Sequence, residues 1–231
     1  MRYLCIIPAR GGSKGLPNKN ILNIEGKPLV TWSIAQALAT DCLAEVIVST
    51  DSEKIMQLAV SSGATVPFKR PDELATDLAA TEPVLLHAIE WYERKAIYFD
   101  AVVLLQPTSP VRYKNSIERA IKQFEKEKAD SLVSVVPNAS FFWKNEENPT
   151  ANYNPQNRRR RQDLNPDDWL FEENGSIYIT RTKLLKDSSC RLGGKISLFK
   201  MELCESFEID NELDWKIVEL MLREATNANR L

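Results

Sequence analysis

The sequence predicts an α/β protein in which a mostly parallel sheet is flanked by helices on both faces. Two observations support this fold class. Apolar, β-branched runs of strand length recur along the chain, and an amphipathic helical pattern follows each of the first three runs. Near-continuous apolar runs are typical of strands buried on both faces, and strands joined through helices run parallel with right-handed crossovers.

The expected elements follow one another in a rhythm of strand, loop and helix. The first strand, YLCIIP, leads through a glycine-rich turn into a helix, and the runs EVIVST and AVVLLQ repeat this arrangement. The segment TEPVLLHAIEWYERK has a helical pattern of its own. We therefore expect strands over 3–8, 45–50, 101–106, 175–180 and 195–201, and further helices over 28–39, 53–62, 115–128, 181–187 and 212–225.

Residues 137–170 interrupt this rhythm. Asn, Pro and Arg become dense there, and the aromatic residues Phe141, Phe142 and Trp143 stand together near one end. Two interpretations remain open, a long surface excursion and an arm that packs on a second subunit, since exposed aromatic side chains usually have something to cover them. We expect one domain over residues 1–231, with the 137–170 segment inserted in it.

Composition excludes several classes of function. Lys and Arg total 30 against 32 for Asp and Glu, so no general basic field draws the protein to nucleic acid. No apolar run approaches the roughly 18 to 20 residues that a membrane span needs, and the chain enters its first strand without a signal-peptide pattern. The four cysteines lack the paired spacing of a zinc site. We expect a cytoplasmic protein with reduced thiols and no nucleic-acid or membrane partner.

The loop PARGGSKGLPNKN at residues 8–20 is the first candidate binding site. Ligands of such sheets bind beyond the carboxyl ends of the strands, which directs attention to the loops after Pro8, Thr50 and Gln106. Glycines can turn several backbone N–H groups into one anion-binding concavity, and Arg10, Lys14 and Lys19 add positive charge. The loop fits neither the Walker A pattern nor G-x-G-x-x-G. A triphosphate suits it, although a tight turn with solvated lysines is the alternative.

The residues of this loop resemble the signature of the acylneuraminate cytidylyltransferases, the enzymes that make CMP-sialic acid. Six further segments match the same family in order and spacing, so the resemblance extends over nearly the whole chain. They are VSTDSEKI at 48–55, RPDELATD at 70–77, LLQPTSPVR at 104–112, RRQDL at 160–164, ENGSIYI at 173–179 and FEIDNELDW at 207–215.

The resemblance implies a Rossmann-like nucleotidyltransferase fold of the GT-A type, with a small dimerisation and sugar-binding arm at about 137–170, and a homodimer. It implies in-line attack by the anomeric hydroxyl of an acidic nine-carbon sugar on the α-phosphorus of CTP, with release of pyrophosphate. Arg10, Lys19 and Asp210 are the expected catalytic residues. The implied nucleotide-binding residues are Ala9, Arg10, Gly11, Gly12, Ser13, Lys19, Asn20, Arg70, Ala80 and Thr81.

The family pattern assigns the sugar to a second group of residues. An arginine fork suits bidentate pairing with the sugar carboxylate, which favours Arg161 within the run of four arginines. The alternatives are a solvated face for this run, a turn without a ligand at Gln106, a turn before Gly175 held by Asn174, and an N-cap role for Thr81. The implied sugar-binding residues are Gln106, Lys144, Arg161, Gln162 and Asn174.

Glu208 and Asp210 flank Ile209, so in an extended segment their carboxylates point the same way and can share a hard cation. Spacing alone favours another role, in which Asp210 or Asn211 caps the following helix. The resemblance makes this the Mg²⁺-binding pair of the family. Relatives usually have Asp-x-Asp, and the longer Glu208 makes a water-mediated contact with the metal an alternative to a direct one.

Three rival functions remain open. A cytidylyltransferase for the eight-carbon sugar Kdo normally lacks the GGSKG form of the loop, and a nucleotide-sugar glycosyltransferase needs Asp-x-Asp where this chain has LLQPTSP. A non-catalytic nucleotide-binding regulator would keep the fold without the chemistry, and weakened metal binding at Glu208 is the feature that favours it, whereas the phosphate loop, Arg161 and the metal-capable pair together speak against it. The lone histidine, His87, lies in the middle of a helix and Cys5 lies within a strand, so we expect both to pack in the interior.

Overall fold

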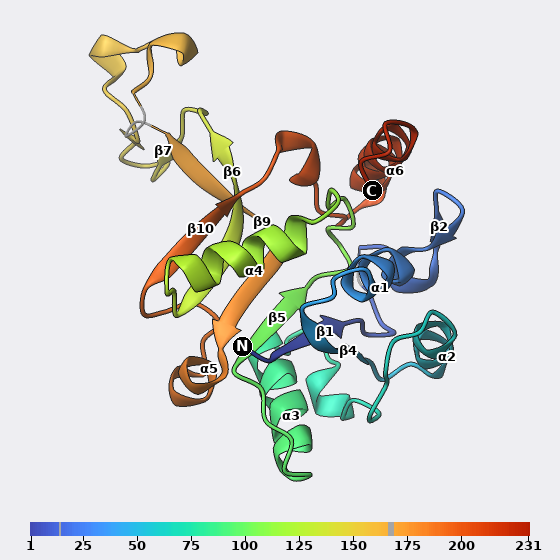
Figure 1. The fold of residues 1–231 in the computed structure, drawn as a ribbon. Helices are drawn as coiled ribbons and strands as arrows, with labels where there is room; N and C mark the ends of the chain where they lie inside the picture. The colour runs from blue at the N-terminus through green and yellow to red at the C-terminus, as the bar shows by residue number, and fades with distance from the viewer. Residues whose placement is uncertain (14, 166–168) are drawn as a thin grey trace.

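A six-stranded mixed sheet lies at the centre of the molecule, with the strand order β10-β6-β9-β5-β1-β4 (Figure 1). The computed structural model describes residues 1–13, 15–165 and 169–231, so Lys14, expected to add charge to the first loop, lies outside the described residues. The strands of the sheet are β1 (Tyr3–Pro8), β4 (Leu43–Ser49), β5 (Ala101–Leu105), β6 (Ser131–Asn138), β9 (Leu170–Arg181) and β10 (Ile196–Lys200).

The predicted mostly parallel sheet is confirmed. Strand β1 pairs in parallel with β4 and β5, and β10 pairs in parallel with β6. Strand β9 is the exception, because it runs antiparallel to both of its neighbours, β5 and β6. It is also longer than the expected 175–180, since its first half continues past the sheet beside β6.

Strand β6 is an element that the sequence analysis missed. Ser131 and Ser134 interrupt its apolar run, yet both are fully buried. The Ser131 hydroxyl donates to the Gly193 carbonyl at 2.8 Å, and the Ser134 hydroxyl donates to Asn174 Oδ1 at 2.6 Å. Because tertiary partners satisfy both hydroxyls, the serines are compatible with a buried strand.

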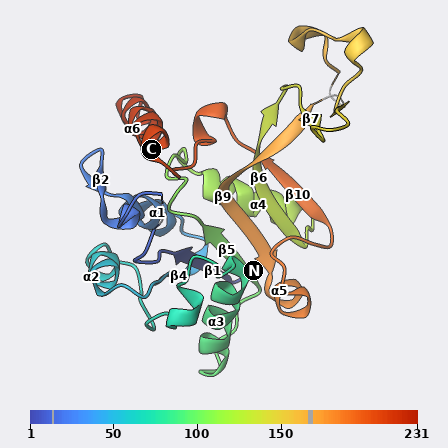
Figure 2. The same ribbon diagram turned by 180° about the vertical axis from the view of Figure 1, so that it is seen from behind.

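The helices cover both faces of the sheet, as predicted. On one face α1 (Leu29–Leu38), α2 (Glu53–Ser61) and α4 (Ser116–Lys126) bury a cluster that includes Ile34 and Phe124. The other face carries α3 (Thr81–Glu93) and α5 (Thr182–Ser188) over a second cluster with Leu85 and Leu185 (Figure 2). Helix α6 (Glu212–Asn227) packs near α1 in a third cluster around Ile209. In the part of the chain that the structure describes, no helix is long and apolar enough to cross a membrane.

The remaining elements are short. Strands β2 (Asn23–Ile24) and β3 (Lys27–Pro28) form a small hairpin after the first loop. Cys5 is fully buried in β1, as expected. His87 is partly buried and packs edge-on against Phe68, with ring centroids 4.5 Å apart, which agrees with a packing role. The other short elements are β7 (Trp143–Lys144), β8 (Thr150–Ala151) and the 3₁₀ turns η1 (Lys19–Ile21), η2 (Asp72–Leu74), η3 (Pro155–Asn157), η4 (Arg161–Asp163) and η6 (Leu203–Glu205).

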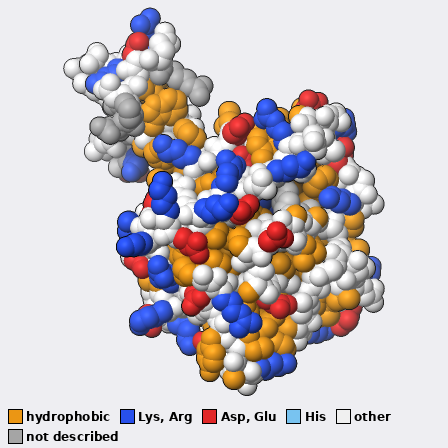
Figure 3. Space-filling view, in the orientation of Figure 1, with side chains coloured by type: hydrophobic (Ala, Val, Ile, Leu, Met, Phe, Trp, Pro, Cys, Tyr) orange, Lys and Arg blue, Asp and Glu red, His pale blue; other side chains and the backbone are white. Residues whose placement is uncertain are grey.

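Strands β6 and β9 continue beyond the sheet as a two-stranded ribbon that carries an arm away from the body (Figures 1 and 3). We call the described part of residues 139–169 the arm. Its aromatic rings contact one another, with Phe141 and Tyr153 centroids 4.3 Å apart and the Arg158 guanidinium 4.5 Å from the Phe141 centroid. Trp143 nevertheless keeps 56% of its surface exposed. The dimerisation role of this arm stays a prediction.

Arg112 ties the end of β5 and the middle of β9 to α1. Its side chain is 1% exposed, and it donates to the carbonyls of Gln106 at 2.7 Å and Ser176 at 2.9 Å and to the Ser33 hydroxyl at 3.0 Å. Burial lowers the pKa of Arg112 to about 10, which leaves it cationic at neutral pH. A buried charge that satisfies several carbonyls fixes the relative positions of the strands that bear them.

Replacing Arg112 with methionine should lower the free energy of unfolding by about 3 kcal/mol or more, because the buried carbonyls of Gln106 and Ser176 lose their donor. Urea denaturation followed by circular dichroism measures this. The control is Arg94→Met, because Arg94 is 70% exposed and pairs with Glu90 within one helix, so its loss should cost less than about 0.5 kcal/mol. Equal effects of the two substitutions would contradict the role of Arg112.

Candidate active site

A cavity of about 280 Å³ opens at the carboxyl ends of β1 and β5. The chain leaves these neighbouring parallel strands in different directions, toward β4 from β1 and toward β6 from β5, which is where open α/β sheets bind ligands. The cavity is lined by Pro8, Arg10, Ser13, Lys19, Asn20, Arg70, Leu74, Thr76, Asp77, Ala79, Ala80, Thr81, Val84, Gln106, Pro107, Thr108, Glu208 and Asp210. Four segments far apart in the sequence therefore meet at one site.

The first loop supplies two cations to the cavity. Arg10 Nη1 lies 2.6 Å from Asp77 Oδ1, and about a third of each of these side chains is exposed. Lys19 is 7% exposed, donates to the Ile209 carbonyl, and places Nζ 3.6 Å from Asp210 Oδ1. Burial lowers the pKa of Lys19, and the nearby carboxylates of Asp210 and Glu208 partly offset this.

Other residues of this loop hold its shape. The Ala9 N–H donates to the Ser49 carbonyl at 2.9 Å, and the Gly11 N–H donates to Asp51 Oδ1 at 2.9 Å. The Asn20 amide donates to the Arg10 carbonyl at 3.0 Å. Ala9, Gly11 and Gly12 do not line the cavity, whereas Arg10, Ser13, Lys19 and Asn20 do. The loop after Thr50 thus acts through Asp51, which supports the first loop.

Arg70, Ala80 and Thr81, expected at the nucleotide, all line the cavity. Arg70 donates through Nε to Ser49 Oγ at 3.1 Å and through Nη2 to the Ser49 carbonyl, and burial lowers its pKa to about 10. The alternative in which Thr81 caps α3 is wrong, because Ala80 occupies the N-cap and Thr81 is the first helical residue. The Thr81 side chain is therefore not engaged in a cap.

The carboxylates of Glu208 and Asp210 reach the cavity from either side of Ile209. Ile209 is fully buried, and its N–H donates to the Thr108 carbonyl at 2.9 Å, which docks this segment on the loop after β5. Glu208 Oε1 accepts from the Thr108 hydroxyl at 2.8 Å. Asn211, and not Asp210, caps α6, since its Oδ1 accepts from Leu213 N and Asp214 N. The cap alternative for Asp210 is therefore wrong, and the Asp210 side chain is 75% exposed.

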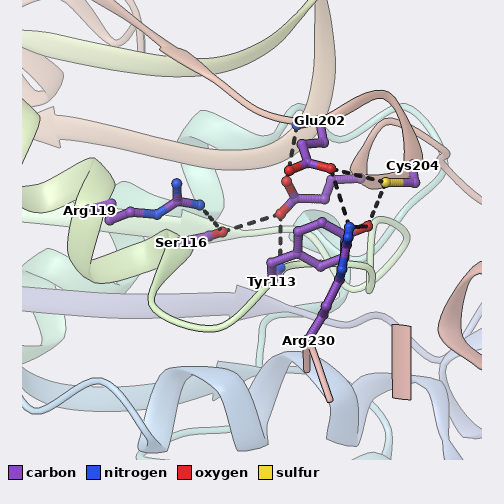
Figure 4. Close-up of polar contacts among 7 residues, drawn as sticks. Tyr113, Ser116, Arg119, Glu202, Cys204 and Arg230 are labelled. Atoms are coloured by element: carbon purple, nitrogen blue, oxygen red, sulfur yellow. Dashed lines mark hydrogen bonds and ion pairs between the residues drawn. The ribbon is translucent and has the colours of Figure 1, made fainter. Parts of the chain in front are cut away.

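A buried carboxylate holds the segment that leads to this acidic pair. Glu205 is 1% exposed and accepts from the Tyr113 N–H at 2.8 Å and from the Ser116 hydroxyl at 3.2 Å. Figure 4 shows Tyr113, Glu202, Cys204 and Arg230 gathered around this junction between the start of α4 and η6. The position of the 207–210 segment is thus fixed from both of its ends.

An irregularity in β9 brings Gly175 against the site. The β6–β9 register shifts between Val133 and Val135, and Asn174 lies opposite this shift. The Asn174 side chain is buried, accepting from Ser134 and donating to the Glu205 carbonyl at 3.2 Å, so it faces the framework and not the cavity. Gly175 has φ +62°, and a Cβ on it would lie 3.0 Å from Glu208 Oε2 and 3.1 Å from Gln106 Oε1. Glycine here satisfies both the backbone conformation and the close approach.

The remaining expected sugar residues lie in the arm. Lys144 is an exposed residue of β7, and Gln162 is an exposed residue of η4. Arg161 begins η4, and its side chain lies outside the described residues. Within the described part of this chain, neither Lys144 nor Gln162 lines the cavity, whereas Gln106 does.

The sequence analysis did not assign the wall formed by Thr76, Asp77, Ala79 and Thr108. Asp77 and Thr108 both fall within segments that carry the family resemblance, RPDELATD and LLQPTSPVR. The signal that could have identified them was their polar character within segments that resemble the family. The pairing of Asp77 with Arg10 could not be predicted, because it joins loops that are distant in the sequence.

Similarity to known proteins identifies the family. Residues 4–223 match the family model described as cytidylyltransferase. The chain belongs to the cytidylyltransferase family. This cytidylyltransferase is 35% identical over 225 residues to a CMP-N,N'-diacetyllegionaminic acid synthase of Legionella pneumophila, covering 96% of this chain and 97% of that relative. It is 31% identical to a pseudaminic acid cytidylyltransferase of Campylobacter jejuni, over 96% of this chain and 97% of that one.

A solved structure shows the same fold. A CMP:2-keto-3-deoxy-manno-octonic acid synthetase complexed with CTP superposes with a TM-score of 0.71 at 18% identity, covering 97% of this chain and 99% of that one. The family assignment makes the chain an enzyme of the nucleotidyltransferase class. The expected fold class and family are both confirmed.

Substituting Gly15 with alanine should separate the first loop from the acidic segment. A Cβ at Gly15 would lie 1.9 Å from the Asp210 carbonyl oxygen, so one of the two backbones must shift. We expect the free energy of unfolding to fall by about 2 kcal/mol or more, as measured by urea denaturation. Gly12→Ala is the matched control, because a Cβ there meets nothing within 4 Å and should cost less than about 1 kcal/mol. An unchanged stability of Gly15→Ala would contradict the close packing.

Proposed function

We propose that this cytidylyltransferase transfers CMP from CTP to the anomeric hydroxyl of a nonulosonic acid, an acidic nine-carbon sugar, and releases pyrophosphate. The observation that carries the proposal is the convergence of Arg10, Lys19 and Arg70 with the Glu208 and Asp210 carboxylates in one cavity. The Legionella and Campylobacter relatives support a nonulosonic acid as the acceptor, since they are named for legionaminic and pseudaminic acids, which belong to this class of sugar.

The cations have separate tasks in this proposal. Arg10 and Lys19 bind the triphosphate and stabilise the negative charge that grows on it during substitution at the α-phosphorus. Ser13 and Asn20 stand beside them on the same loop. Arg70, through its contact with Ser49, fixes the segment that leads to Ala80 and Thr81. These two residues line the nucleoside end of the cavity. Preorganised donors of this kind need no rearrangement as the charge develops.

Cytidylyltransferases of this fold generally use a divalent metal ion. The donor set here fits Mg²⁺, because Glu208 and Asp210 offer two carboxylates beside the phosphate-binding cations, and Mg²⁺ is commonly held by one or two carboxylates plus substrate phosphates. When bound, Mg²⁺ supplies charge neutralisation at the phosphate oxygens. Thr108 holds Glu208 through one carboxylate oxygen, and Lys19 holds the backbone between the two acids.

The sugar is assigned to the mouth of the cavity and to the arm. Gln106 presents its amide at the end of β5, where Arg112 fixes its backbone. Lys144, Arg161 and Gln162 belong to the arm, which reaches away from the body of its own chain. A homodimer in which the arm of one subunit contributes to the site of the other accounts for both placements. Asn174 serves this site by holding the β9 irregularity.

The direct test is pyrophosphate release from CTP and MgCl₂ in the presence of each candidate sugar. N-acetylneuraminate, legionaminate, pseudaminate and KDN are compared with Kdo, and we expect release with a nine-carbon acid, abolished by EDTA. Asp210→Asn should lower kcat/KM at least about 100-fold, since it removes a charge at the reacting phosphates. The control Glu212→Gln, on the exposed first turn of α6, should retain activity.

Silence with all five sugars, despite binding of CTP, would overturn the proposed reaction and favour a nucleotide-binding regulator. Release with Kdo alone would reassign the acceptor.

The four cysteines are free thiols in the structure, which supports the proposed cytoplasmic location.

The proposed homodimer has its own test. Trp143→Ser together with Phe141→Ser removes aromatic surface from the arm, where Trp143 is 56% exposed. Sedimentation velocity should show a dimer for the unaltered protein and a shift toward monomer for the double variant. The control Leu220→Ser removes an exposed side chain of α6 and should leave the dimer intact. Sedimentation of the unaltered protein as a monomer would contradict the proposed homodimer.

A further inference from the structure

Each of the three cations Arg10, Lys19 and Arg70 that line the cavity has a partner within the chain. Lys19 contacts the Ile209 carbonyl and Asp210, and Arg70 contacts the Ser49 carbonyl. Arg10 pairs with Asp77, with 2.6 Å between Nη1 and Oδ1. A phosphate that binds these cations must therefore compete with groups of the protein.

Asp77 differs from the other carboxylates of the site. Asp210 belongs to the proposed metal pair, and Asp51 accepts the N–H of Gly11 and so supports the first loop. The Asp77 carboxylate comes from another segment of the cavity lining and engages the same guanidinium that the proposed function assigns to the triphosphate. It therefore occupies a contact of Arg10 that the proposed function gives to a phosphate.

The segment that carries Asp77 lies outside the buried core. It lies between η2 (Asp72–Leu74) and the start of α3, and the neighbouring Leu78 is 92% exposed. Arg70 anchors the segment at its beginning through Ser49, and α3 anchors its end. Asp77 and Arg10 keep 36% and 30% of their side chains exposed, so an entering ligand reaches the pair from solvent.

We propose that Asp77 is an internal competitor of the nucleotide phosphates, which holds Arg10 until the triphosphate displaces it and which takes Arg10 back as pyrophosphate leaves. This inference rests on the proposed function for the identity of the nucleotide. A triphosphate carries more charge than one carboxylate and offers a guanidinium several acceptor oxygens, so it wins the exchange. The competition weakens the binding of every ligand that needs Arg10, and thereby favours release of pyrophosphate after the reaction.

The test compares ligands that carry the outer phosphates with one that lacks them. Titration calorimetry in the presence of Mg²⁺ gives the affinities of CTP and pyrophosphate, and competition against CTP gives that of cytidine. Asp77→Asn should bind CTP and pyrophosphate about fivefold more tightly, the factor expected for loss of a partly exposed ion pair, and cytidine with unchanged affinity. Asp77→Ser should give the same gain, whereas Asp77→Glu, which keeps the carboxylate, should show a smaller one.

The matched control is Asp72→Asn, which removes the same charge from the preceding turn η2 at an exposed position outside the cavity lining. It should bind all three ligands as the unaltered protein does. Equal or weaker binding of pyrophosphate by both Asp77→Asn and Asp77→Ser would overturn the proposal, as would an equal gain in Asp72→Asn. Failure of the unaltered protein to bind CTP would remove the proposed function, while the pyrophosphate titrations would still decide whether Asp77 competes for Arg10.

Discussion

The site depends on one contact between distant parts of the chain, the ammonium of Lys19 on the carbonyl of Ile209, 190 residues away. Ile209 is buried in a cluster that also receives Leu16 from the first loop. The absence of a side chain at Gly15 lets the two backbones approach each other at Asp210. The first loop and the acidic segment are therefore one packed unit, and the separation between the Lys19 ammonium and the carboxylates is set by the core.

A second constraint comes from a buried cation behind the cavity lining. Arg112 contacts the carbonyls of Gln106, directly after β5, and of Ser176, within β9. Thr108 and Gly175, from the same two regions, determine where Glu208 can lie. The longer side chain of Glu208 is accommodated because the glycine leaves room and the threonine supplies a donor. Two uncharged residues thus define the position of the Glu208 carboxylate.

Much of the fold followed from the sequence, for identifiable reasons. Strands β1 and β5 are buried on both faces, so their apolar runs were unambiguous, and the helices that follow them alternate clearly. Strand β6 escaped because Ser131 and Ser134 look polar until Gly193 and Asn174 are seen to satisfy them. The antiparallel direction of β9 escaped as well, because direction is set by pairing and leaves no mark on hydrophobic periodicity.

The site shows the same division. Arg10, Lys19 and Asp210 could be proposed because they belong to compact motifs, whereas the pairing of Arg10 with Asp77 depends on how two loops face each other. Local spacing favoured a cap at Asp210 or Asn211, and the structure gives that role to Asn211. An N-cap and a ligand contact have similar sequence signatures, since both use short polar side chains before a helix.

The ribbon of β6 and β9 separates sequence changes in the arm from sequence changes in the body of the molecule. Its strands belong to the central sheet at one end, while the arm at the other end contributes little to the three buried clusters. Substitutions, insertions or whole replacements between Asn138 and Leu170 leave the nucleotide chemistry on its own scaffold. Under the proposed function, the acceptor preference can therefore change by replacement of the arm, while the loop and the acidic segment proposed to bind the nucleotide stay the same.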